Sequence, residues 1–451
     1  MLRESWGSRV GFMFGAIGSA VGLANIVRFP YLVGYYGGSA FVITYLGCLL
    51  LVGFPVFVTE VLIGRSTHRN PKGAFTLLGR SSFWSGAGIL LIITGVIVCS
   101  FYSVLSGWIL GYLVEAILGH LAHFSNTAES VTFHGTLTKN PIWAVEYHAL
   151  FIFVCVAVLY KGVRKGLERF NKILLPLMFL VLLYLLVVGL QLENAGLGLS
   201  FLFKPNWSTI TPAVFLMALG QAFFTLSAGQ GTMITYGSYL PSNVNLLSSC
   251  FPIVLADITI SIVAAVAVFT IVFSVGIEPN AGIGLIFHIL PVVFSKLPSG
   301  YWIAIGFFLL VALAALTSEI SAMEPFIAYL IDERHWRRSH AVLCSGLIVF
   351  ILGIPSALSY SLLKDITWHE LPIIEIVDFV CTGILIPLGG FLTVLLVGWR
   401  WGIKSALVEL NFGAQNLCEK HPFLKIYLSI CVRFVAPFAI LVILIEAVCF
   451  F

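Results

Sequence analysis

The chain has 451 residues, of which 59% are hydrophobic and 10% are charged, and its mean hydropathy is +1.04. Soluble domains carry about 25% charged residues, so this composition excludes an ordinary soluble protein and predicts a polytopic membrane protein. The formal net charge is only +4.

Apolar runs of about 20 residues, the length of a membrane-spanning helix, recur along the chain. From them we expect one all-α integral membrane domain with about eleven spans. The expected spans are 8–33, 39–64, 84–119, 146–160, 171–191, 211–239, 246–275, 301–331, 339–354, 372–399 and 424–450. The longest loops are expected at about 120–145, 192–210 and 276–300. Within the last loop, the apolar stretch Ile283 to Phe294 is too short to span and predicts a surface or re-entrant hairpin.

Basic residues gather in alternate loops. One set comprises Arg3, Arg9, Arg65, Arg69, Lys72, Arg80, Lys161, Arg164, Lys165, Arg169, Lys172, Arg334, Arg337, Arg338, Arg400, Lys404, Lys420 and Lys425. The opposite loops hold only Lys139, Lys204, Lys296 and Lys364. The positive-inside rule therefore predicts a cytoplasmic N-terminus and, with an odd number of spans, an outside C-terminus. This topology explains the basic loops, so we expect no nucleic-acid partner. The expected location is the inner (plasma) membrane of the cell.

Motifs of ATP-driven and metal-dependent chemistry are missing from the sequence. There is no GxxxxGK[ST] phosphate loop, no HExxH and no CxxC pair. Most of the nine cysteines lie within apolar runs, so no disulfide framework is implied. We expect no organic cofactor, and a driving gradient is a better energy source for this chain than ATP.

The first expected span is interrupted. Gly18 to Pro30 contains glycines, an asparagine, an arginine and a proline within one apolar run. In hydrocarbon each unpaired backbone group costs several kcal/mol, so a broken helix is tolerated only where it lines a protein cavity. Interrupted spans are also where secondary transporters hold ions and substrates.

The sixth expected span is interrupted as well. Thr225 to Thr232 contains Ser227, Gly229 and Gly231 at the midpoint of the run, and glycine permits the positive φ that a helix break requires. Close helix packing through small residues is the alternative explanation for one such segment. Two interrupted spans five spans apart predict an inverted repeat with its site at the membrane midplane. The expected divisions are repeat one at about 8–191, repeat two at about 211–402 and an extra helix at about 424–450.

Motifs in the same order cover essentially the whole chain. They are Trp6-Gly-Ser-Arg9, Gly22-Leu-Ala-Asn25, Arg28-Phe-Pro30, Gly37-Gly38-Ser-Ala-Phe41, Glu60, Gly64-Arg65, Gln221-Ala-Phe-Phe-Thr-Leu-Ser227, Gly229, Gly231, Leu316-Thr-Ser318 and Asp378-Phe379. This set resembles the neurotransmitter:sodium symporter family, especially its bacterial amino-acid members with the LeuT fold. The resemblance implies a 5+5 inverted repeat with unwound helices 1 and 6 plus an eleventh helix. It also implies sodium-driven uptake of an amino acid by alternating access.

The resemblance implies two sodium sites. The first would use Ala20, Asn25, Thr225 and Asp257, and the second Gly18, Val21, Ala314, Thr317 and Ser318. Family members commonly have asparagine where this chain has Asp257. A carboxylate near a desolvated cation in a low-dielectric site supplies compensating charge. We therefore expect chloride-independent transport. Protonation of Asp257 on the return step, giving proton counter-transport, is a secondary hypothesis.

The resemblance also implies the substrate site. The amino-acid carboxylate would be held by Leu23, Ala24, sodium and the Tyr102 hydroxyl, and the ammonium by carbonyls of Ala20, Phe224 and Thr225 with the Ser227 hydroxyl. The side-chain pocket would consist of Val98, Phe224, Gln230, Ser318 and Ala322. Leucine-type members have a large aromatic and a branched aliphatic residue at the positions of Gln230 and Ala322. We expect a hydrophobic or bulky neutral amino acid, with another small amine or a polar amino acid as the alternative.

Two gates complete the implied machinery. The outer gate would pair Arg28 with Asp378 beneath a vestibule, with Tyr102 and Phe224 as a lid. The inner gate would pair Arg3 with Asp332, helped by Trp6 and Tyr239. Glu319 and Glu324 are acidic where the family more often has neutral residues, and the sequence assigns them no role.

Other functions remain as alternatives. An ion channel would need an uninterrupted pore, usually with a repeated filter sequence. A membrane enzyme would need a clustered nucleophile and base or a metal set, which His68 and Glu60 do not complete. Membrane lipid is an expected partner, and the oligomeric state is left open.

Overall fold

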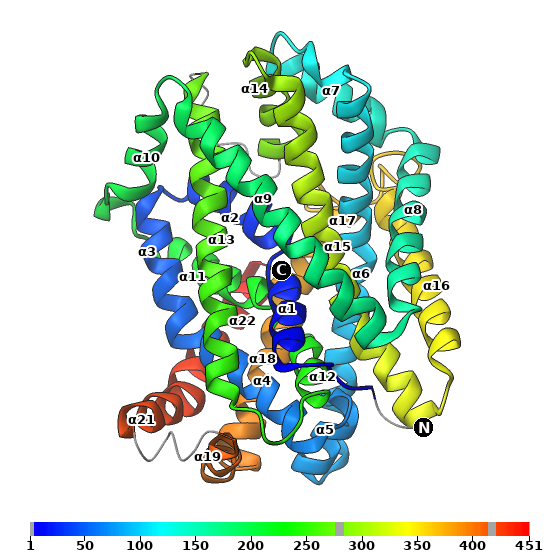
Figure 1. Cartoon of the computed structure of the whole chain (residues 1–451), viewed down its shortest axis with the longest axis vertical. Helices are drawn as coiled ribbons and strands as arrows, with labels where there is room; N and C mark the ends of the chain where they lie inside the picture. The colour runs from blue at the N-terminus through cyan, green and yellow to red at the C-terminus, as the bar shows by residue number, and fades with distance from the viewer. Residues whose placement is uncertain (1–3, 276–283, 414–420, 451) are drawn as a thin grey trace.

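The computed structural model describes residues 4–275, 284–413 and 421–450, which are almost entirely helical (Figure 1). Within these ranges nine helices are long and apolar enough to cross a membrane, and a bent pair near the N-terminus makes a tenth. The nine are Ser39–Thr67, Ser82–Ile117, Pro141–Leu159, Val163–Gln191, Leu246–Ser274, Gly300–Arg334, Arg338–Ala357, Ile373–Arg400 and Pro422–Ala447. Each one coincides with an expected span, so the multi-pass membrane fold is confirmed.

Several spans combine α-helical parts with a π-helical turn. Pro55 and Pro387 are each the second residue of the α-helical part that follows such a turn, and proline has no N–H to continue the ordinary α-helical hydrogen bonding. Five spans are single α-helices: α6 (Ser82–Ile117), α8 (Pro141–Leu159), α13 (Leu246–Ser274), α15 (Gly300–Arg334) and α16 (Arg338–Ala357). The other four of the nine consist of α3 (Ser39–Cys48), η2 (Leu49–Gly53) and α4 (Phe54–Thr67); η4 (Val163–Glu168) and α9 (Arg169–Gln191); α17 (Ile373–Phe379), η7 (Val380–Leu385), α18 (Ile386–Leu395) and η8 (Leu396–Arg400); and α21 (Pro422–Ile430), η9 (Cys431–Val435) and α22 (Ala436–Phe450).

The first expected span is a broken helix. Its lower half is α1 (Arg9–Ala20), and its upper half is η1 (Ala24–Arg28) followed by α2 (Phe29–Tyr35). The two halves differ in direction by 47°. At the end of α1, Val21 has the extended backbone angles φ −84° and ψ 97°, which stop the helix. The interruption predicted from composition is therefore present.

The sixth expected span consists of two short helices, α11 (Pro212–Thr225) and α12 (Thr232–Ser238). The chain between them leaves helical geometry three times, at Ser227 (φ 51°), Gly229 (φ 84°) and Gly231 (φ 79°). A Cβ atom at Gly229 would collide with the carbonyl oxygen of Ile386, so glycine is needed there for close packing as well as for its backbone angle. The second predicted break is also present.

Short helices occupy the two ends of the bundle. The lower end in Figure 1 carries α5 (Pro71–Gly79) and α19 (Ile403–Asn411), which belong to basic loops. The expected outer loops contain η3 (His120–Ala122), α7 (Thr127–Thr138), α10 (Ala195–Phe203) and η5 (Trp207–Thr209), together with the strands β1 (Thr367–Trp368) and β2 (Leu371–Pro372). The expected apolar hairpin appears as η6 (Leu285–Ile289) and α14 (Leu290–Lys296), while Ile283 lies outside the described residues.

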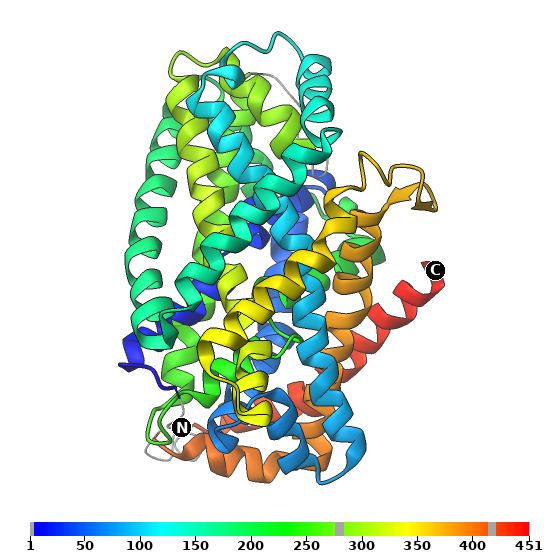
Figure 2. The same ribbon diagram turned by 90° about the vertical axis from the view of Figure 1, so that its right-hand side faces the viewer.

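The centre of the bundle is built around α6 and α15, which pack extensively against each other. Helix α1 packs against α9, α13 and α15, and α12 packs against α4. Figure 2 shows α22, coloured red, at one edge of the bundle. Large apolar side chains such as Phe153 (68% exposed) and Phe438 (71% exposed) cover the outer faces, as expected for contact with lipid tails. The two helix breaks lie inside this arrangement.

Candidate functional site

The two helix breaks lie side by side at the centre of the molecule. The Ser227 hydroxyl donates to the carbonyl oxygen of Ser19 at 3.0 Å, and Nε2 of Gln221 donates to the carbonyl oxygen of Ala24 at 2.7 Å. Hydroxyl and amide side chains therefore satisfy carbonyl groups near the break in the first span. The resemblance gave a role to Ser227 but not to Ser19 or Gln221.

A buried polar cluster forms where the first break meets α13. Asp257 is fully buried, and its Oδ1 accepts from Nδ2 of Asn25 at 2.6 Å and from the Thr225 hydroxyl at 2.7 Å. Oδ2 accepts from the hydroxyl of Tyr45 at 3.2 Å, and Asn25 also donates to Ser261 at 2.8 Å. Three of the four residues expected at the first sodium site thus share one cluster. The fourth, Ala20, ends α1 at the break.

Tyr45 and Ser261 were not predicted for this cluster. Tyr45 lies on α3 and Ser261 is one helical turn beyond Asp257 on α13. The spacing of Ser261 is a sequence signal, because residues four apart share a face of a helix. Nothing local to Tyr45 indicates that it contacts a residue on α13.

The second expected sodium site lies where α1 meets α15. The Ser318 hydroxyl donates to the carbonyl oxygens of Gly18 at 3.4 Å and Ser19 at 3.2 Å. The Thr317 hydroxyl donates to the carbonyl oxygen of Ala314 at 3.0 Å within α15. Val21, also expected at this site, is buried at the end of α1. Hydroxyl and carbonyl oxygens are hard ligands of the kind that an alkali cation prefers.

A small cavity of about 30 Å³ separates the two breaks from α6 and α15. Nearly all residues expected to bind substrate line it, from both breaks and from both helices. The lining consists of Ser19, Ala20, Gly22, Ala24, Val98, Tyr102, Phe224, Ser227, Gln230, Ser318, Glu319 and Ala322. The structure therefore brings the predicted pocket residues together.

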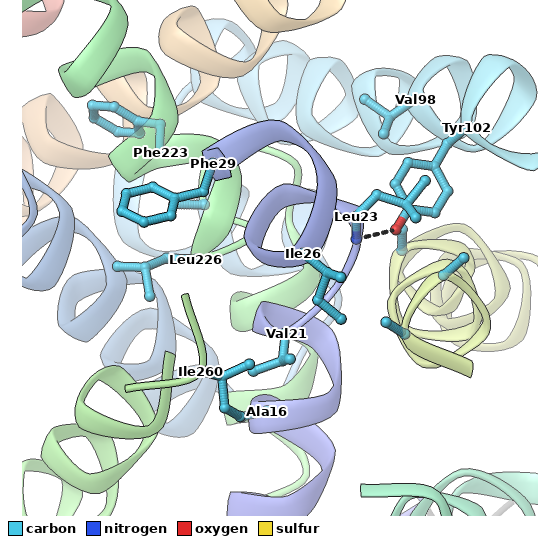
Figure 3. Close-up of a cluster of buried hydrophobic side chains, with 14 of the residues drawn as sticks. Ala16, Val21, Leu23, Ile26, Phe29, Val98, Tyr102, Phe223, Leu226 and Ile260 are labelled. Atoms are coloured by element: carbon cyan, nitrogen blue, oxygen red, sulfur yellow. Dashed lines mark hydrogen bonds between the residues drawn. The ribbon is translucent and has the colours of Figure 1, made fainter. Parts of the chain in front are cut away.

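The remaining substrate-site residues adjoin this cavity. The backbone N–H of Leu23 donates to the Tyr102 hydroxyl at 3.2 Å, a contact drawn in Figure 3 beside Val98. Thr225 lies in the Asp257 cluster. A Cβ atom at Gly22 would lie only 3.0 Å from the Tyr102 hydroxyl oxygen and would overlap the Ser318 hydroxyl. Glycine at this position therefore allows α6 and α15 to approach the first break.

The expected outer gate lies directly above the cavity. Arg28 and Asp378 line one pocket together with Tyr102 and Phe224. The guanidinium of Arg28 is 4.9 Å from the centre of the Phe224 ring, a cation–π contact. Its Nη1 has no hydrogen-bond partner among the described residues, and in that part of the chain Arg28 and Asp378 form no direct ion pair.

Aromatic residues of α6, α7 and η6 pack against one another at the upper end of the bundle in Figure 1. The Tyr112 hydroxyl is 3.0 Å from Nδ1 of His134, and the His134 ring stacks on Phe287. Burial, with a smaller contribution from nearby His288, lowers the pKa of His134 to about 3. His134 is therefore neutral at physiological pH and adds no charge above the cavity.

The expected inner gate is only partly described, since Arg3 lies outside the described residues. Asp332 accepts from the backbone N–H and Nδ2 of Asn70, both at 3.2 Å. Trp6 donates from Nε1 to the carbonyl oxygen of Tyr236 at 2.9 Å and packs edge-on against Tyr239. Trp6 and Tyr239 therefore meet at the lower end, as expected.

Glu324, to which the sequence assigned no role, forms a bidentate ion pair at this lower end. Its carboxylate accepts from Nη1 of Arg338 at 2.8 Å and from Nη2 at 2.9 Å, and also from the Tyr239 hydroxyl at 2.9 Å. Glu324 is fully buried, whereas Arg338 is 14% exposed. The pair links α15 and α16 to the segment after α12. Like Tyr45 and Ser261, this ion pair was not predicted from the sequence.

The chain is similar along its whole length to known membrane transporters. A family profile described as the sodium:neurotransmitter symporter family matches residues 3–140 and 130–451. The sodium-dependent transporter YhdH of Bacillus subtilis is 35% identical over 98% of this chain and 97% of its own length. A sodium-dependent transporter of Haemophilus influenzae is 33% identical over 98% of each chain. The crystal structure of MhsT in complex with L-phenylalanine is 39% identical, with a TM-score of 0.89, over 99% of this chain and 100% of that one.

Proposed function

The chain belongs to the sodium:neurotransmitter symporter family, and from this premise we propose that it imports an amino acid with sodium by alternating access. The family and the LeuT fold are those of sodium-dependent membrane transporters, not of enzymes. One observation carries the amino-acid proposal. Two broken helices face each other around a cavity with a buried acid beside it, an arrangement suited to a zwitterion and a cation.

We propose that two sodium ions are bound beside the cavity. Asn25, Thr225 and Asp257 with the carbonyl group of Ala20 would hold the first, and the mutual contacts of their side chains support this grouping. The second would be held where Gly18 and Val21 meet Ala314, Thr317 and Ser318. Protonation of Asp257 in the returning empty carrier, with proton counter-transport, is a secondary proposal.

The substrate would lie between the breaks. Leu23, Ala24 and the Tyr102 hydroxyl would hold its carboxylate, and carbonyls of Ala20, Phe224 and Thr225 with the Ser227 hydroxyl would hold its ammonium. Val98, Phe224, Gln230, Ser318 and Ala322 would surround the side chain, and all five line the same cavity. The sequence favours a hydrophobic or bulky neutral amino acid. The polar Gln230 in the lining favours a polar amino acid as the second candidate.

We further propose that Arg28 and Asp378 gate the outer side and that Arg3 and Asp332, with Trp6 and Tyr239, gate the inner side. The repeats would cover about 8–191 and 211–402, followed by the extra helix at 424–450. In the proposed orientation the lower end of Figure 1, which carries α5 and α19, faces the cytoplasm. The protein would lie in the inner (plasma) membrane with its C-terminus outside.

Sodium-dependent binding is the direct test of this function. Purified protein in lipid nanodiscs is expected to bind at least one standard amino acid at least about ten times more tightly in sodium than in potassium buffer, because bound sodium supplies charge to the substrate carboxylate. Equilibrium binding of each of the twenty amino acids measures this. Sodium-independent binding, or none in the whole panel, would contradict the proposal. Saturable uptake into proteoliposomes distinguishes a transporter from a channel.

Replacing Ser318 with alanine is expected to weaken the apparent sodium affinity about tenfold, because one hydroxyl ligand of the proposed second site is lost. The sodium dependence of amino-acid binding measures the change. Ser429→Ala is the matched control, since among the described residues the Ser429 hydroxyl bonds to the carbonyl oxygen of Lys425 one turn earlier in α21 and to no other group. Equal sodium affinity in both variants would remove Ser318 from the site.

A further inference from the structure

Glu319 is a buried acid within the substrate cavity that the proposed mechanism does not use. It follows Ser318 on α15, is 1% exposed, and lines the cavity together with Val98, Gln230 and Ala322. These three residues belong to the proposed side-chain pocket. Glu319 is therefore placed to meet the variable part of a substrate, not its carboxylate or ammonium group.

Neither carboxylate oxygen of Glu319 has a hydrogen-bond partner that meets ordinary geometric criteria within the described chain. The thiol of Cys99 lies beside the carboxyl group, but a thiol is only a weak donor. A buried acid is costly unless it is paired and hydrogen-bonded. No described residue therefore supplies a strong hydrogen-bond donor to Glu319, and a bound ligand could supply one.

The other buried acids near the centre do have partners. Asp257 accepts from Asn25, Thr225 and Tyr45, and Glu324 is paired with Arg338. Glu60 accepts from the backbone N–H of Gly229 through one oxygen. Among these described acids, Glu319 alone has no hydrogen-bond partner on either oxygen, and Glu319 also lines the cavity.

A second unpartnered acceptor lies in the same cavity. Oε1 of Gln230 is buried and has no hydrogen-bond partner among the described residues. Gln230 belongs to the second break and Glu319 to α15, so the two acceptors approach the cavity from different elements. Two acceptors without donors match a ligand that carries several N–H groups. Because Glu319 is an acid, a positively charged ligand group is favoured.

We propose that Glu319 and Gln230 bind a cationic nitrogen group on the side chain of the transported amino acid, so that amino acids with basic side chains are the preferred substrates. This inference rests on the proposed sodium-coupled amino-acid transport, and it assigns a basic side chain to the substrate in place of the neutral side chain that the sequence favours. A charge-assisted hydrogen bond from a cationic N–H group to the Glu319 carboxylate is stronger than a hydrogen bond from a neutral donor.

Lysine and norleucine provide the test, because norleucine is lysine without its terminal amine. In saturating sodium, the wild-type protein in nanodiscs is expected to bind lysine at least about ten times more tightly than norleucine, since a site built for a donor rejects an analogue that lacks it. Glu319→Gln is expected to reduce this preference at least tenfold while norleucine affinity stays the same or improves. Glu193→Gln, an acid-to-amide change at an exposed position, is expected to keep the wild-type ratio.

The outcomes separate this inference from the proposed function. Sodium-dependent binding in which norleucine equals or exceeds lysine in the wild type overturns the role of Glu319 and leaves sodium-coupled amino-acid transport intact. An unchanged ratio in folded Glu319→Gln overturns it as well. Absence of sodium-dependent binding of any amino acid overturns both proposals. Should Glu319→Gln not fold, Glu319→Asp takes its place with retained charge and a shorter reach, and the wild-type ratio alone still decides.

Discussion

Asp257→Asn is expected to make sodium-dependent binding require chloride, whereas the wild-type protein binds equally well with chloride or gluconate as the anion. In chloride-free buffer the apparent sodium affinity of the variant is expected to fall 10- to 100-fold. The reason is charge balance. A zwitterionic main chain brings no net charge to compensate a desolvated sodium ion, and the Asp257 carboxylate would supply a negative charge at the proposed first sodium site. Asparagine keeps the size of the side chain but removes this charge.

The hydrogen bonds around Asp257 allow the Asp257→Asn variant to be compared directly with the wild-type protein. Asn25, Thr225 and Tyr45 all donate to its carboxylate, and an asparagine carbonyl oxygen can still accept from part of this set. The variant is thus expected to fold. Binding titrations of sodium at several chloride concentrations measure the effect, and Asp365→Asn, an exposed acid in an outer loop, serves as the control.

Two outcomes would contradict this prediction. Wild-type binding that depends on external chloride would mean that Asp257 does not replace an anion. A variant whose sodium affinity is the same as that of the wild type, with or without chloride, would mean that the carboxylate contributes no charge to the site.

The helix breaks could be predicted from the sequence because their cause is local. A glycine, an asparagine and a proline inside apolar runs, as in Gly22, Asn25 and Pro30, cannot continue a lipid-exposed helix at low cost. Backbone angles at Val21 and Gly229 agree with that cause. Hydropathy also located the spans, since the length and apolarity of each run are properties of the run itself.

Contacts between distant elements could not be predicted in the same way. In the sequence Tyr45 is an ordinary aromatic residue of an apolar helix. Its hydrogen bond to Asp257 becomes visible only when α3 is packed in the folded structure. Glu324 and Arg338 are both visible as charged residues, but whether they meet depends on the turn between α15 and α16. The helices α7 and α10 lie in segments expected as loops, where short apolar or mixed sequences give little periodic signal.

Arg338→Ala is expected to open the lower end of the transporter. Its guanidinium bonds to Glu324 and also donates from Nε to the carbonyl oxygen of Leu159, so it joins α8, α15 and α16. Removing it leaves a fully buried carboxylate whose remaining hydrogen-bond donor among the described residues is the Tyr239 hydroxyl. Breaking similar buried pairs costs about 3–5 kcal/mol. A conformation in which water reaches Glu324 avoids this cost.

The expected shift in population is therefore large, about 100-fold or more toward the inward-open state. Hydrogen–deuterium exchange of α12 and of the segment around Trp6 is expected to speed up, while sodium-dependent binding from the outer side weakens at least tenfold. Arg337→Ala, which removes the exposed neighbouring arginine, controls for the loss of one positive charge at this end. In the double variant Glu324→Gln with Arg338→Met no carboxylate is left unpaired, so its exchange is expected to lie closer to the wild type. Exchange and binding that stay unchanged in Arg338→Ala would show that this ion pair does not hold the lower end closed.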